Sequence, residues 1–158
     1  MRFPSRGQVQ HDRFVLRTDL APGIGHAAHG VTAVDEDHVY VLWVSKEKIS
    51  LYALSHEGEM QWKSEFEGME SRHGGGSSLL LTDDNVVFTR EQEKGSSVNS
   101  SWVATDKETG EISWEIERET VNANSFSTPI LIPTESQAPQ LIFGSQAHGL
   151  TAVNPETG

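Results

Sequence analysis

The sequence predicts an all-β protein, and two observations support this expectation. First, the apolar residues come in short blocks separated by Gly, Asn, Asp and Ser, a pattern typical of strands joined by turns. Second, glycine turns recur at Gly58, Gly110 and Gly158, about fifty residues apart, which indicates an internal repeat. The expected strands are VYVLWV at 39–44, SLYAL at 50–54, SLLL at 78–81, VVF at 86–88, PILI at 129–132, LIF at 141–143 and LTAV at 150–153.

The block at 39–44 indicates how these strands pack. Alternate residues of a strand point to opposite faces, and both faces of this block are apolar: Val39, Val41 and Trp43 on one, Tyr40, Leu42 and Val44 on the other. Such a strand is covered above and below. Because the connecting segments are too short for crossover helices, stacked antiparallel sheets are expected.

The repeating units share one order of features. Each has an inner strand, a second strand, a third strand that ends in a small residue, and a glycine turn; the small residues are Ala53, Ala104 and Ala152. In two units a fourth strand carries a tryptophan four residues after the glycine, at Trp62 and Trp114. Four antiparallel strands repeated roughly every 40–50 residues describe the blades of a β-propeller.

The residues in and around the glycine turns indicate which kind of propeller is expected. The second unit carries Ala104, Asp106, Thr109, Gly110 and Trp114; the third carries Ala152, Asn154, Thr157 and Gly158; the first keeps Ala53, Gly58 and Trp62. This spacing resembles the tryptophan-docking motif of pyrroloquinoline-quinone-like propellers. The residue types suit packing, since Ala lets a neighbour approach, Asp and Thr bond turn amides, Gly takes a left-handed conformation and Trp buries a large ring against the adjoining unit.

Boundaries follow from the repeat. Residues 1–24 hold a possible outer strand of a preceding or closing blade, 25–68 form the first blade, 69–120 the second, and 121–158 a third without its fourth strand. Propellers close with about 4–8 blades. About three blades are therefore expected to be part of a larger propeller.

The composition excludes several classes of function. The 158 residues include 12 Lys and Arg against 23 Asp and Glu, a net charge of −11, which disfavours nucleic acids and anionic membranes as partners. The absence of cysteine excludes disulfides and thiolate chemistry. No apolar run approaches the roughly 18 residues of a membrane helix, and no signal peptide is visible. The compartment is left open by the residues, while the resemblance implies a bacterial protein in the periplasm or otherwise outside the cytoplasm.

Candidate binding residues lie in the loops that lead into the inner strands. Propellers usually bind at the mouth of the central channel, and we predict that His29, Arg72, His73 and Asn124 converge there on a polar site. The alternative is that they are ordinary loop residues. No metal site is predicted, because the histidines lack an HExxH pattern or a close acidic ligand. No nucleophile and base can be paired, so no catalytic residue is predicted.

The preferred hypothesis is a non-catalytic scaffold that binds protein partners or a small ligand, resembling the propeller component of the outer-membrane assembly machinery. Its partners would include the remaining blades of the same parent protein. Two alternatives stay open. One is a fragment of a quinoprotein dehydrogenase that oxidises alcohols or sugars with pyrroloquinoline quinone and calcium, cofactors expected only on that alternative. The other is a sensor module of a larger signalling protein.

Overall fold

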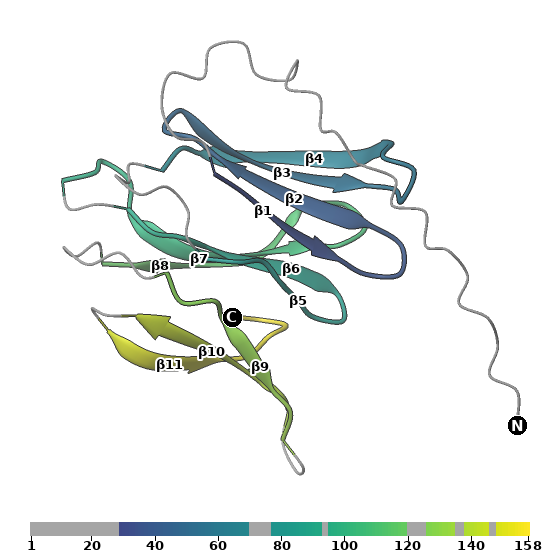
Figure 1. Cartoon of the computed structure of the whole chain (residues 1–158). Coiled ribbons are helices and arrows are strands. Elements are labelled where there is room, and N and C mark those ends of the chain that lie inside the picture. The colour runs from purple at the N-terminus through teal and green to yellow at the C-terminus, as the bar shows by residue number, and fades with distance from the viewer. Residues whose placement is uncertain (1–28, 70–76, 93–94, 120–125, 135–137, 146–147) are drawn as a thin grey trace, which may run out of the picture.

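The computed structural model describes residues 29–69, 77–92, 95–119, 126–134, 138–145 and 148–158, and all of its regular elements are strands. The prediction of an all-β fold is confirmed. The strands form three antiparallel sheets, here called blades 1 to 3 (Figure 1). Blade 1 contains β1 (His29–Val34), β2 (Val39–Val44), β3 (Lys48–Leu54) and β4 (Met60–Glu67) in that order.

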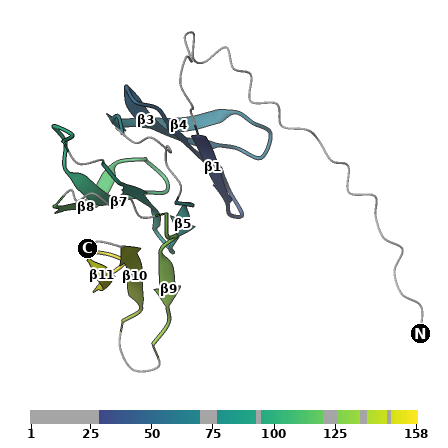
Figure 2. The same ribbon diagram turned by 60° about the vertical axis from the view of Figure 1, so that its left-hand side comes forward.

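Blades 2 and 3 repeat this order of neighbouring strands. Blade 2 contains β5 (Leu80–Leu81), β6 (Asn85–Arg90), β7 (Ser100–Asp106) and β8 (Ile112–Arg118), and the described part of blade 3 contains β9 (Ile130–Ile132), β10 (Gln140–Ser145) and β11 (Gly149–Val153). The three sheets are stacked in chain order, with blade 2 in the middle (Figures 1 and 2). This is the arrangement of consecutive propeller blades.

One apolar cluster joins blade 1 to blade 2. The face of blade 1 supplies Tyr40, Leu42, Val44, Ile49, Leu51 and Ala53, and the facing residues of blade 2 include Val86, Phe88 and Val103. The rings of Phe66 and Phe88 meet edge to face, with centroids 5.2 Å apart. The core therefore lies between sheets, because a single sheet has no interior of its own.

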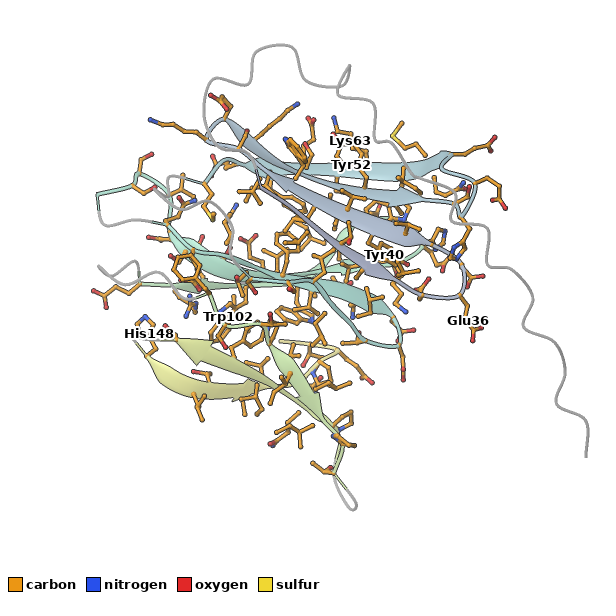
Figure 3. The ribbon with its side chains drawn as sticks, viewed as in Figure 1. Glu36, Tyr40, Tyr52, Lys63, Trp102 and His148 are labelled. Atoms are coloured by element: carbon orange, nitrogen blue, oxygen red, sulfur yellow. The ribbon has the colours of Figure 1, made fainter. Side chains whose placement is uncertain are left out.

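A second cluster joins blade 2 to blade 3. It contains Val87, Trp102, Ala104 and Trp114 from blade 2 and Leu141 and Phe143 from blade 3. Trp102 and Phe143 stack with ring centroids 4.1 Å apart and an angle of 11° between their planes. Figure 3 shows Trp102 between the two sheets. Blade 2 is thus covered on both faces, as expected for stacked sheets.

Two expected strands are shorter in the structure. The block at 78–81 contributes only Leu80 and Leu81 to a strand, and the block at 129–132 contributes only Ile130–Ile132. The residues before β5 bond the next blade instead: the Ser77 hydroxyl donates to the Ser127 carbonyl at 3.2 Å, and the Ser78 amide donates to the Thr128 hydroxyl at 3.3 Å. These contacts tie the inner edge of blade 2 to blade 3.

The far face of blade 3 is exposed and apolar. Ile130 is 54% exposed and Leu150 is 81% exposed. Ile130 of β9 pairs with Ile142 of β10, and Leu80 of β5 pairs with Val87 of β6. Ile130 in blade 3 and Leu80 in blade 2 are therefore equivalent positions. Leu80 is packed in the cluster between blades 2 and 3. The residues that the structure describes therefore leave exposed on blade 3 the surface that is buried on blade 2.

Candidate functional site

The turn at Asp106–Gly110 is built from its own side chains. Oδ1 of Asp106 accepts hydrogen bonds from the Glu108 amide at 2.9 Å, the Thr109 amide at 2.8 Å and the Thr109 hydroxyl at 2.9 Å. The bond from the Thr109 amide is the main cause that lowers the pKa of Asp106. Gly110 has φ of 73° and donates its amide to the Asp106 carbonyl. The sequence Asp-x-x-Thr-Gly therefore determines a closed turn that ends in a glycine of left-handed conformation.

The turn in blade 3 has the same construction. Asn154 Oδ1 accepts from the amides of Glu156 and Thr157, at 2.7 Å and 3.1 Å. Gly158 has φ of 84° and bonds the Asn154 carbonyl. We call these two segments, Asp106–Gly110 and Asn154–Gly158, the docking turns.

The two tryptophans of the fourth strands, Trp62 and Trp114, each lie on the docking turn of the following blade. The indole Nε1 of Trp62 donates to the Lys107 carbonyl at 2.7 Å, and that of Trp114 donates to the Pro155 carbonyl at 3.0 Å. The Trp62 ring covers Gly110 so closely that a Cβ there would collide with it. The indoles are thus placed between blades, with their N–H groups satisfied.

The small residues of the motif lie opposite these rings. Ala53 pairs with Trp62 across β3 and β4, and Ala104 pairs with Trp114 across β7 and β8. Ala152 occupies the corresponding place in β11 and is exposed. The first blade departs from the motif at Ser55, whose hydroxyl accepts from the Glu57 and Glu59 amides at 3.3 Å in place of a carboxylate.

A charged contact reinforces the junction of blades 1 and 2. Nζ of Lys107 lies 3.1 Å from Asp35 Oδ2, in the turn between β1 and β2. Burial by itself raises the pKa of Asp35, but the bonds from the His38 amide and from Lys107 lower it more, to about 2. The Tyr40 hydroxyl donates to the same carboxylate at 3.2 Å, and burial together with Asp35 raises the pKa of Tyr40.

Two ion pairs lie at the opposite end of blade 2. Nη2 of Arg90 is 2.6 Å from Glu115, and its Nε donates to the Ser101 hydroxyl at 3.0 Å. Nη2 of Arg118 is paired with Glu91, and its guanidinium lies 4.3 Å from the centroid of a Trp102 ring. Figure 3 shows His148 near this end of the sheets. Burial raises the pKa of Glu91 and lowers that of Arg118, each against the pull of its partner.

A shallow groove of about 470 Å³ follows the outer rim between β4 and the docking turn of blade 2. Phe66 and Ile112 supply its apolar part, and Lys63, Glu65 and Glu111 supply its charges. Ser64 closes the inner side, since its hydroxyl donates to the Gly110 carbonyl at 2.5 Å. The groove is thus bordered by the same contacts that join the two blades.

The predicted mouth residues mostly fall outside the described part of the chain. This holds for Arg72, His73 and Asn124, while His29 begins β1 and its side chain is not among those described. Their convergence stays a prediction. Sequence reasoning missed Glu91 and Arg118; the signal available was the position of Arg118, four residues after Trp114 and so on the same face of β8.

The described residues contain no group of three or more His, Asp or Glu side chains placed to hold a metal ion. In the same part of the chain, no helix is long and apolar enough to cross a membrane.

Comparison with known families identifies the repeat. The family model described as outer membrane protein assembly factor BamB matches residues 8–158. The chain belongs to this family. The predicted resemblance to pyrroloquinoline-quinone-like propeller repeats is confirmed, and a BamB-like repeat accounts for both the stacked sheets and the docking turns. A comparison with curated protein sequences found no match.

Proposed function

We propose that this BamB-like chain is a non-catalytic scaffold module of a larger propeller, which binds protein partners through its loops and further blades through its open sheet. The family description, an assembly factor, supports a role in protein interactions. The observation that carries the proposal is the uncovered apolar face of blade 3, with Ile130, Ile132 and Leu150 exposed. Apolar sheet faces of this kind are stable in water only when another surface covers them.

The use of the charged residues also supports a scaffold. Asp35 and Lys107 join blades 1 and 2, and the buried carboxylate of Glu91 is neutralised by Arg118. Arg90 is bonded to Ser101 and Glu115 within blade 2. These side chains are thus paired with other residues within and between the sheets, as expected for charged residues with a structural role.

The proposed partner site is the loop end of the propeller, where we place His29, Arg72, His73 and Asn124. Its chemistry is polar and partly cationic, which suits an acidic or carbonyl-rich protein surface. The test uses the full-length parent protein carrying an affinity tag, isolated from its own cells with its bound partners. Arg72→Ala with His73→Ala should lower the amount of co-purified partner several-fold.

The matched control is Asp83→Ala with Asp84→Ala, a pair of exposed turn residues in blade 2. If both double variants retain their partners equally, the loop site is wrong. A second arm mixes the purified full-length protein with pyrroloquinoline quinone, calcium and an alcohol or sugar, and follows reduction of a dye. Turnover that requires the quinone would replace the scaffold with a dehydrogenase.

A further inference from the structure

The two interfaces between blades can be compared position by position. Tyr40 pairs with Ala53, and Val87 pairs with Ala104, so Tyr40 and Val87 are equivalent. Four residues further along the chain, Val44 in blade 1 corresponds to Glu91 in blade 2. In the outer strands Trp62 corresponds to Trp114, and four residues later Phe66 corresponds to Arg118.

At the first interface this position is apolar. Val44 is buried in the cluster between blades 1 and 2, and Phe66 packs against the same cluster. Phe66 meets Phe88 of blade 2 edge to face. A polar contact accompanies these apolar side chains, since Nε2 of Gln92 in blade 2 donates to the Gly68 carbonyl of blade 1 at 3.0 Å.

At the second interface the same position holds an ion pair. The side chains of Arg118 and Glu91 are only 8% and 10% exposed. Nε and Nη1 of Arg118 are buried and have no hydrogen-bond partner among the residues that the structure describes. A buried ion pair with unsatisfied donors is commonly less favourable than apolar side chains of similar volume, so stability does not explain the replacement.

The residues of the strands that face this position give a better explanation for the ion pair. Phe88 of blade 2 packs on blade 1, and Phe143 of blade 3 packs on blade 2. Two residues beyond each phenylalanine, blade 2 carries Arg90 and blade 3 carries Ser145. If a copy of blade 2 packed on blade 2 in place of blade 3, its Arg90 would come to the position of Ser145, on the side of Arg118. Arg90 is paired with Glu115 of its own blade, so a second ion pair would then be buried beside that of Arg118 and Glu91, where blade 3 has only the small Ser145. The added desolvation and side-chain volume are unfavourable.

We propose that Glu91 and Arg118 are specificity-determining residues of the interface, which let the face of blade 2 accept blade 3 and reject a second copy of blade 2. Blade 1 has the apolar side chains of Val44 and Phe66 at these positions, and blade 2 is the neighbour that packs on them. Polar groups that select one packing at some cost in stability have this role in other repetitive assemblies. These two residues would set the order of the blades whatever the loops bind.

The test transfers the first interface to the second, with Glu91→Val and Arg118→Phe in the full chain. Wild-type and variant chains are refolded from urea at several concentrations, and the ratio of oligomer to monomer is measured by size-exclusion chromatography with light scattering. We expect this ratio to rise about fivefold or more in the variant. The control, Glu36→Gln with Glu57→Gln, changes two exposed residues of blade 1 and should leave the ratio unchanged.

Glu91→Gln with Arg118→Met gives a second route if the larger ring disturbs folding. It removes both charges with little change in length and should raise the ratio in the same direction. Arg90→Ser removes the opposing side chain and should raise the ratio with Glu91 and Arg118 intact. Equal ratios in the wild type and in the variants at positions 91 and 118 would overturn the proposal.

Discussion

At Gly110 two requirements meet in one residue. Its φ of 73° lies in the region that disfavours a side chain, and Trp62 and Ser64 of the neighbouring blade leave no room for one. A Cβ would lie 2.6 Å from Ser64 Oγ. Backbone conformation and packing between blades therefore select the same amino acid.

Gly110→Ala is expected to lower the free energy of unfolding by about 2–4 kcal/mol, the sum of left-handed strain and overpacking. The control is Gly95→Ala, because Gly95 has φ of 97° but no atom within 4 Å of the place that an added methyl group would take. It should cost only about 1 kcal/mol. Urea denaturation measures both, and equal losses would show that Trp62 contributes nothing at this position.

Asp35 predicts a dependence of stability on pH. Its folded-state pKa of about 2 lies below its ordinary value of 3.8, so its ionised form stabilises the fold above about pH 4, and this contribution is lost as the pH falls towards 2. Asp35→Asn should reduce the loss of stability across that range by on the order of 1–2 kcal/mol, with allowance for its partial exposure. Urea midpoints measured between about pH 2 and 5 test this.

Asp83→Asn, on an exposed turn of blade 2, is the control for removing one carboxylate. Lys107→Met should also weaken the dependence of stability on pH, since it removes the ammonium group that pairs with the Asp35 carboxylate. An unchanged pH profile in the Asp35 variant would contradict the assignment.

Among the strands, β3 with β4 and β7 with β8 share one irregularity. Their registers shift just after the alanine, between Ala53 and Leu54 and between Ala104 and Thr105. A bulge at this point bends the outer strand and turns the tryptophan. The repeated bulge therefore helps direct each indole towards the next blade.

At the alanine that precedes each bulge, we expect a larger side chain to be tolerated only where no following blade covers the position. Ala104 is fully buried opposite Trp114, so Ala104→Leu should cost about 1–3 kcal/mol by overpacking. Ala152→Leu makes the same change at the equivalent, exposed place in β11 and should stay within about 0.5 kcal/mol. Chemical denaturation measures the free energy of unfolding of both variants. Similar losses of stability would mean that the covering blade is not the reason why Ala104 must be small.

For the whole molecule, the open face of blade 3 predicts self-association of the isolated chain. Ile130→Glu with Leu150→Glu places charges on that face, and sedimentation velocity should show a lower fraction of oligomer than in the wild type. Glu36→Gln with Glu57→Gln again serves as the control and should leave the fraction unchanged. Equal oligomer fractions in all three chains would exclude this face as the contact.

Much of this architecture could be predicted from the residues. Short apolar blocks and glycine turns are local signals, and the predicted strand at 39–44 coincides with β2. The hydrogen bonds inside the turn at Asp106 span at most a few residues, so their chemistry is also visible in the sequence. The shortened β5 was not predictable, because Ser77 and Ser78 bond residues of the next blade that are far away in the chain.

By itself, the sequence determined the strands, the repeat and the closed docking turns, since each depends on side chains close together along the chain. The residue types also predicted that the tryptophans of the motif pack against the adjoining unit. Only the tertiary structure decided that Trp62 bonds the Lys107 carbonyl, that Arg118 meets Glu91, and that the described residues leave one face of blade 3 uncovered. These contacts arise when whole sheets are stacked, and residues so far apart in the chain carry no local mark of the neighbour they will meet.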